Sequence, residues 1–87
     1  MRAISAVARE IIGDWGDNIN YAARPYLGAM LNLTKITDVY ASDRAEHIVR
    51  YFLSNANTYR GATARRLKAE LKEILKHHKH TTEGGER

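Results

Sequence analysis

The last third of the chain carries the clearest chemical signal, a run of positive charge. Residues 60–80 hold seven Lys or Arg against two Glu, whereas residues 1–59 hold six of each sign, so the net charge of +4 gathers in one segment. Guanidinium and ammonium groups bind phosphate or carboxylate oxygens, and an aromatic ring beside them can stack on a base. The candidate contact residues for nucleic acid or an acidic partner are Tyr59, Arg60, Arg65, Arg66, Lys68, Lys72 and Lys76.

The same charges also suit a helix face that only meets water. Lys and Arg stems cover the flank of a core, and Arg66 lies four residues before Glu70, the spacing of an ion pair within one helix. A basic second helix is typical of helix–turn–helix DNA readers, but the helix before it is too long for that unit and the basic face lacks Asn and Gln. Nucleic-acid contact is one alternative, and a solvated or protein-binding face is the favoured one.

A catalytic triad is the next chemistry to consider. Asp43, His47, Arg50 and Ser54 share one face of a predicted helix. Ser54 and His47 are seven residues apart, about 10 Å along the helix axis, which is beyond hydrogen-bond reach. We therefore predict no catalytic residues and regard an enzyme as the weakest functional class.

Metal binding is weakly indicated. His77 and His80 are helical neighbours, with His78 between them, but no carboxylate or cysteine completes the usual four ligands. The acidic residues Glu10, Asp14 and Asp17 lack the glycine and terminal Glu of a calcium loop. We predict neither a metal site nor a cofactor.

Two patterned helices joined by a hinge at residues 57–61 must position the basic residues. The first starts with a capping box, Asp43 and Glu46, and the hinge contains Gly61, which can adopt a left-handed conformation. The apolar positions recur at helical spacing. They are Ala45, Ile48, Val49, Phe52, Leu53 and Ala56 in the first helix, and Ala64, Leu67, Leu71, Ile74 and Leu75 in the second.

The first half of the chain predicts two further helices. Residues 4–13 form one, with a glycine stop at Gly13 and Gly16 and an apolar face of Ile4, Val7, Ala8, Ile11 and Trp15. Residues 22–33 form another, either capped by Asn20 and kinked at Pro25 or beginning at Pro25 itself. Residues 34–40 have helical rather than alternating spacing and predict a single helical turn.

Several segments resemble a group of small bacteriophage and prophage proteins of unknown function. They are Trp15, YAARPYLGAM (21–30), DRAEHIVRYFLSNA (43–56) and YRGATARRLKAELK (59–72), within a resemblance that covers most of residues 5–75. The resemblance implies a phage gene product and brings no activity or site residues. Tyr59 stands where that group is expected to carry a tryptophan.

Length and composition limit the remaining choices. The sequence predicts one all-α domain, a compact bundle of three to four helices over residues 1–80, followed by a disordered tail at 81–87 that lacks apolar residues. No apolar run approaches the roughly 20 residues of a membrane span, so we expect no membrane contact and a cytoplasmic location. The expected core is Val7, Ile11, Leu27, Met30, Leu31, Ile48, Val49, Phe52, Leu53, Leu67, Leu71 and Ile74.

Three functional hypotheses follow. The first is a non-catalytic phage accessory protein that binds a host protein. The second is a small nucleic-acid-binding factor that uses the basic helix. The third is a self-assembling module in which Leu67, Leu71, Ile74 and Leu75 pair between chains. An exposed apolar patch on the folded monomer would favour the first or third, and a wide positive surface without one would favour the second.

Overall fold

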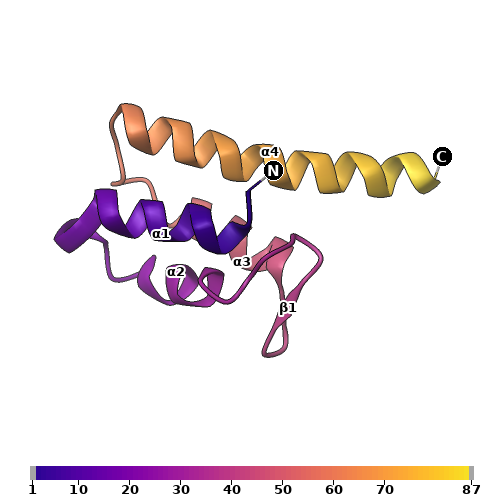
Figure 1. Cartoon of the computed structure of the whole chain (residues 1–87), viewed down its shortest axis with the longest axis horizontal. Helices are drawn as coiled ribbons and strands as arrows, with labels where there is room; N and C mark the ends of the chain where they lie inside the picture. The colour runs from indigo at the N-terminus through magenta and orange to yellow at the C-terminus, as the bar shows by residue number, and fades with distance from the viewer. Residues whose placement is uncertain (1, 87) are drawn as a thin grey trace.

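Four helices carry most of the chain in this computed structural model, which describes the backbone of residues 2–86 and the side chains of residues 2–77. They are α1 (Ile4–Trp15), α2 (Arg24–Met30), α3 (Ala45–Ser54) and α4 (Ala62–Glu86), with a 3₁₀ turn, η1 (Gly16–Asn18), after α1. Figure 1 shows α4 lying along α1 and continuing past the other helices. The mostly helical character predicted from the sequence is confirmed.

The core lies where α1 and α3 each pack against both α2 and α4. Helices this short are unstable alone in water, so mutual burial of their apolar stripes holds the fold together. The predicted stripes of α1 and α4 are buried in full. Two expected core residues are not fully buried: Leu31, just past the end of α2, is 39% exposed, and Leu53 is half-buried at the edge of the core. Leu33 is fully buried instead.

The helical turn predicted for residues 34–40 is right in part: the amide of Asp38 donates to the carbonyl of Lys35 at 3.0 Å, which closes one turn, but residues 39–40 belong to a two-stranded antiparallel hairpin. β1 (Val39–Tyr40) pairs with β2 (Asp43–Arg44), with Val39 opposite Arg44 and Tyr40 opposite Asp43. Ala41, in the turn, has a left-handed φ of 57°. Asn or Gly normally marks such a turn, so its usual sequence signature is missing here. The all-α prediction is corrected to a mostly helical fold with one small sheet.

The predicted capping box at the start of α3 is also wrong. Asp43 belongs to β2, and Arg44 precedes the helix with no side-chain cap. The amide of Ala45 donates instead to the carbonyl of Asp38, at 2.8 Å. The Asp38 carboxylate accepts the backbone N–H groups of Lys35 (3.0 Å) and Thr34 (2.9 Å), and these two bonds hold its pKa below the ordinary value. One acidic residue therefore ties the 34–38 loop to α3.

Glycine and proline mark the helix ends in part as predicted, but Gly13 does not stop the first helix: α1 runs through it to Trp15, two residues past the predicted end at residue 13. Gly16, with a φ of 59°, ends α1, and Gly61, with a φ of 112°, precedes α4. Helix α2 begins at Arg24, with Pro25 in its first turn. It ends at Met30 and is therefore shorter than the predicted 22–33. The Asn20 side chain accepts the N–H of Ala23 at 2.9 Å, so it caps the turn before α2.

The end of α4 differs from the predicted tail. Its backbone is helical through Glu86, where the sequence predicts disorder at 81–87. The side chains of residues 78–87 lie outside the described part of the chain, and the disorder of this tail stays a prediction.

Candidate binding surfaces

The flank of α4 that faces α1 is neutralised by a network of ion pairs. Arg2 donates to both carboxylate oxygens of Glu70 (Nε to Oε2, 2.8 Å; Nη2 to Oε1, 2.6 Å), and its Nη1 lies 2.9 Å from Oε1 of Glu10. Arg66 donates to the other oxygen of Glu10. Arg66 and Arg2 hold the pKa of Glu10 below its usual range, and Arg2 does so for Glu70. The predicted Arg66–Glu70 pair is therefore wrong, because Arg66 pairs with the carboxylate of Glu10.

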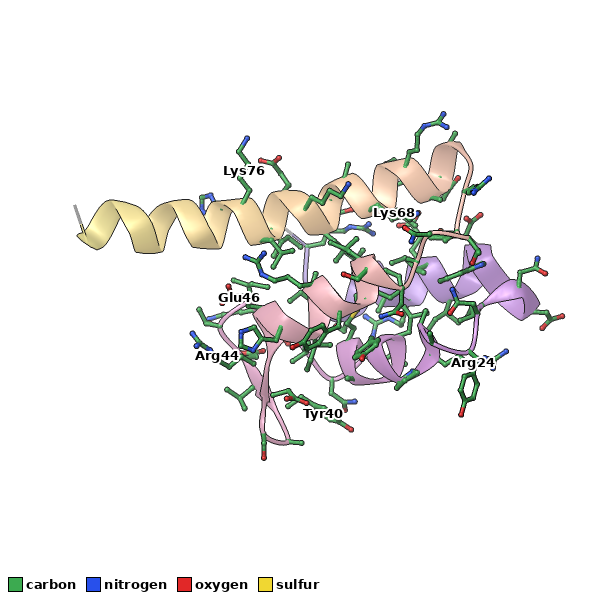
Figure 2. The ribbon with its side chains drawn as sticks, turned by 180° about the vertical axis from the view of Figure 1, so that it is seen from behind. Arg24, Tyr40, Arg44, Glu46, Lys68 and Lys76 are labelled. Atoms are coloured by element: carbon green, nitrogen blue, oxygen red, sulfur yellow. The ribbon has the colours of Figure 1, made fainter. Side chains whose placement is uncertain are left out.

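A second set of cations forms what we call the cationic stripe: Arg65, Lys68, Lys72 and Lys76. On an α-helix these positions fall within about 80° of one another and span about 17 Å of the axis, away from Arg66 and Glu70. Among the side chains that the structure describes, no carboxylate forms an ion pair with any of the four. Lys76 points away from the helices below it (Figure 2). One side of α4 therefore carries charges in ion pairs, and another side carries the cationic stripe.

Tyr59 is buried, which corrects its predicted role as a stacking platform for bases. Its side chain is 2% exposed, its ring stacks on Trp15 with centroids 4.7 Å apart, and its hydroxyl donates to the Asp14 carboxylate at 2.8 Å. Burial, and then the bond to Asp14, raises the pKa of Tyr59. The ring supports the fold from inside.

Lys68 lies over this buried ring, with its Nζ 5.7 Å from the centroid of Tyr59, a cation–π contact. Burial lowers the pKa of Lys68, and the neighbouring charges of Lys72 and Arg60 lower it further. Arg60 is exposed and its Nε donates to the carbonyl of Asn57 at 3.3 Å. Arg60, Lys68 and Lys72 therefore concentrate positive charge at the start of α4.

An aromatic cluster, here called the tyrosine surface, lies where α2 meets α3 and consists of Tyr26, His47 and Tyr51. The ring of Tyr51 is 5.8 Å from that of Tyr26 and 6.4 Å from that of His47. Tyr51 is 53% exposed, and His47 is also exposed. The sequence carried one signal for this surface, because Tyr51 falls outside the apolar stripe of α3. The pairing with Tyr26 depends on packing between two helices.

The hairpin exposes two more large apolar side chains. Val39 is 62% and Tyr40 41% exposed, and the hairpin projects from the helices (Figure 1). Ala41 at its tip holds a φ that L-residues with a Cβ rarely adopt, a strain that tends to occur at functional sites.

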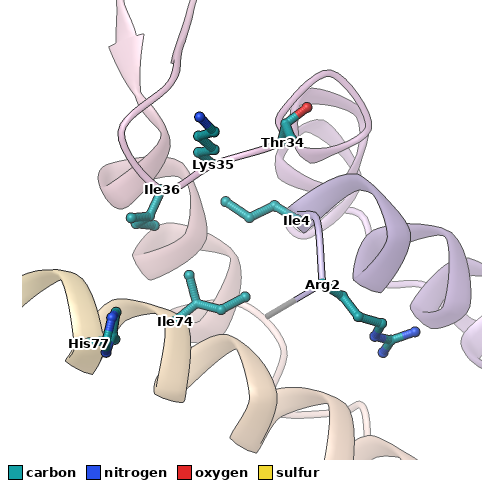
Figure 3. Close-up of a pocket in the computed structure, with 7 residues that line it drawn as sticks. All are labelled: Arg2, Ile4, Thr34, Lys35, Ile36, Ile74 and His77. Atoms are coloured by element: carbon teal, nitrogen blue, oxygen red, sulfur yellow. The ribbon is translucent and has the colours of Figure 1, made fainter.

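A pocket of about 180 Å³ opens between the start of α1, the 34–36 loop and α4. Figure 3 shows the side chains of Ile4, Ile36 and Ile74 converging on it, while the guanidinium of Arg2 extends away from them. Thr34, Lys35 and His77 complete the lining. We call this the isoleucine pocket, and nothing in the sequence pattern indicated it, because its three walls come from distant segments.

The side chains considered for catalysis and for metal binding are not arranged as a site in the described structure. Asp43 lies on β2 rather than on α3, Ser54 Oγ donates to the carbonyl of Arg50 at 3.1 Å, and Arg50 pairs with Glu46 at 3.3 Å. Within the part of the chain that the structure describes, no three His, Asp or Glu side chains gather as metal ligands. The side chains of His78 and His80 lie outside that part.

The leucine stripe of α4 is not available for self-assembly. Leu67 and Leu71 are fully buried, and Ile74 and Leu75 are at most 8% exposed, because they pack against the rest of the same chain. Pairing between chains through these residues would require the monomer to open, so this form of the oligomer hypothesis is corrected.

Comparison with known proteins gives no match. No protein-family model, curated protein or solved structure matches the chain. Over the described residues, none of the helices combines the length and the apolar character needed to cross a membrane.

Proposed function

We propose that this chain is a non-catalytic bacteriophage accessory protein that binds a host protein through the tyrosine surface, in the cytoplasm of the infected cell. The phage origin is supported by the resemblance of residues 5–75 to small phage proteins. The binding role is supported by one observation above all: the exposed ring of Tyr51 packs against exposed His47 on one side and half-buried Tyr26 on the other.

Exposed tyrosines are effective in an interface. Tyr is enriched at protein interfaces because it supplies a large rigid contact area and a hydroxyl at little cost in side-chain entropy. Tyr40 and Val39 add exposed apolar area on the hairpin. An exposed apolar patch is the feature that favours a protein partner over nucleic acid.

The test compares partner binding by the immobilised wild-type protein and two variants of it. Nuclease-treated lysate of the phage host is passed over each, retained proteins are identified by mass spectrometry, and the principal one is purified and titrated. Tyr51→Ala should weaken binding by at least about tenfold, as truncation of a central aromatic contact typically does. Tyr21→Ala is the matched control, since Tyr21 is 90% exposed and lies outside the cluster. Equal binding by both variants would overturn the proposal.

Nucleic-acid binding is the second candidate, and the cationic stripe is what favours it. Four cations without carboxylate partners in the described structure lie along one line of α4, with Arg60 near its start. Such an array suits successive phosphates of a backbone. The nucleic-acid candidate has fewer contact residues than the sequence suggested, because the ring of Tyr59 is buried and Arg66 is paired with Glu10.

A further inference from the structure

The exposed surface of α4 has a crest and two flanks of different chemistry. The crest, opposite the buried stripe on the helical wheel, is formed by Ala62, Ala69 and Glu73, all of which are exposed. The cationic stripe lies on one flank. The other flank carries Arg66 and Glu70, which are held in the ion pairs described above. Among the described side chains of α4, unpaired cations therefore lie along a single flank.

The cationic stripe is straight and open to solvent. Its members follow one another at intervals of three or four residues, so each step rises by about 4.5 to 6 Å along the helix axis. Arg65, Lys72 and Lys76 are exposed, and Lys68 is half-buried. Figure 1 shows α4 as the outermost helix, extending past the others, and Figure 2 shows Lys76 pointing away from them. A straight polyanion can therefore meet these charges one after another.

The start of the cationic stripe is crowded with like charge. Burial lowers the pKa of Lys68, and the nearby charges of Lys72 and Arg60 lower it further. Among the described residues, no carboxylate forms an ion pair with any of these three. An anion bound here would relieve the repulsion between them, so the surface is complementary to a ligand that carries several negative charges.

The side chains that read bases, or stack on them, are missing from this helix. Residues 62–77 contain no Asn, Gln, Phe, Tyr or Trp, and the ring of Tyr59 beneath Lys68 is 2% exposed. Single strands bind where aromatic rings stack on their bases. If α4 entered a major groove, the alanines of the crest would face the bases and the flank with Glu70 would face the second row of phosphates. Both features favour contact with one phosphate row from outside the groove.

We propose that the cationic stripe, with Arg60 at its start, binds the phosphates of one strand of a nucleic-acid duplex and reads no base sequence. This inference rests on the second candidate function, nucleic-acid binding. A duplex carries one negative charge per about 1.7 Å of its axis, twice the density of either strand alone. It is also rigid, so it presents this charge without the ordering cost that a flexible acidic peptide pays.

The test measures binding of the full chain to three labelled nucleic acids of equal length by fluorescence anisotropy. They are an alternating A·T duplex, an alternating G·C duplex and an oligo(dT) single strand. The two duplexes should bind within about threefold of each other, and the single strand at least about fivefold more weakly at low salt. Four phosphate contacts predict a slope of the logarithm of binding constant against that of salt near about −3.6 for the duplexes and about −2.8 for the single strand.

Matched variants test whether the whole stripe takes part. Arg65→Gln and Lys76→Gln remove the cations at its two ends, and each should flatten the duplex slope by about 0.9, the value for one phosphate contact. Arg24→Gln is the control, because Arg24 is exposed on α2 and lies away from α4 (Figure 2). It should leave the slope unchanged. Thermal melting of each variant shows that it folds.

Four results would overturn the inference. They are single-strand binding as tight as duplex binding, a preference of more than about tenfold between the two duplexes, unchanged slopes in both end variants, and displacement of the duplex by poly-glutamate as effectively as by unlabelled duplex. The last would identify an acidic protein segment as the occupant. No binding to any of the three nucleic acids would remove the second candidate function as well, so the two failures are distinguishable.

Discussion

Trp15 and Tyr59 stack with ring centroids 4.7 Å apart and an angle of 19° between their planes. Trp15 ends α1 and also meets Phe52 of α3 edge-on, at 6.3 Å. The Tyr59 hydroxyl reaches back to Asp14, next to Trp15 in sequence. The hinge before α4 is therefore fastened to the end of α1 by an aromatic stack and a hydrogen bond to a carboxylate.

Removing the Tyr59 hydroxyl should weaken this fastening without disturbing the stack. Tyr59→Phe should lower the free energy of unfolding by about 1–3 kcal/mol, the usual cost of losing a hydrogen bond to a charged group. Tyr21→Phe is the control and should stay within about 0.5 kcal/mol, because Tyr21 is 90% exposed. Urea denaturation of the wild type and the two variants measures both changes in the free energy of unfolding. Equal stabilities would show that the bond to Asp14 contributes nothing.

The same hydroxyl should make the fold sensitive to alkali. Burial and Asp14 raise the pKa of Tyr59 above its ordinary 10, so the folded state keeps a proton that the unfolded chain loses. The stabilisation is present in full below about pH 10 and is lost as the pH rises from there towards the folded pKa, by at most about 1.4 kcal/mol per pH unit. Stability curves of wild type and Tyr59→Phe should therefore converge above pH 10, and parallel curves would contradict this.

Neighbouring residues of α3 should differ sharply when truncated. Phe52 is fully buried at the centre of the core, and Phe52→Ala should cost about 3–5 kcal/mol, much of the stability of a domain this small. Tyr51→Ala, one residue earlier on the exposed side, should change melting little. A Phe52→Ala protein that melts within a few degrees of wild type would show that this stripe is not the core.

Gly61 should resist substitution for backbone reasons alone. Its φ of 112° lies where L-residues are strained, although an added Cβ would meet no atom within 4 Å. Gly61→Ala should therefore destabilise by about 1–2 kcal/mol. Gly28→Ala is the control: Gly28 lies inside α2 with equally open space around it, and alanine there should be neutral or stabilising. The same loss at both positions would remove the conformational explanation.

Salt dependence should decide the nucleic-acid candidate. If the cationic stripe contacts about four phosphates, the logarithm of the binding constant should fall with the logarithm of salt concentration with a slope near −3 to −4. Lys68→Gln with Lys72→Gln should flatten the slope by about two. Arg66→Gln should leave it unchanged, because Arg66 is already paired with Glu10. No binding at tens of micromolar protein in about 150 mM salt would remove this candidate.

Helical periodicity predicted the four helices and the buried stripes, because a 3.6-residue repeat depends only on local sequence. All the predicted stripe residues of α4 are buried; in the stripe predicted for α3, Leu53 is only half-buried and Ala56 is buried but lies past the end of the helix. The hairpin was missed because its turn uses Ala41 rather than Asn or Gly, and its stability depends on contacts made through Asp38. A two-residue strand is too short for alternation to be visible.

The surfaces were less predictable than the core. The positive charge of α4 was evident in sequence, but its division into a paired and an unpaired side was not, since Glu10 and Arg2 come from the other end of the chain. Tyr59 was expected outside and lies inside, because only the folded chain brings Trp15 and Asp14 to it. The isoleucine pocket likewise needs three distant segments at once.

The packing of α1 against α4 has a consequence for synthesis in the cell. Residues 62–75 are translated after every other part of the core, yet α1 needs them to cover Ile4, Val7 and Ile11. The nascent chain must therefore expose the apolar residues of the α1 segment while the middle of the protein is being made, and it cannot reach its final state in stages from the N-terminal end. A ribosome that stalls before Leu67 would leave that helix to chaperones or proteases.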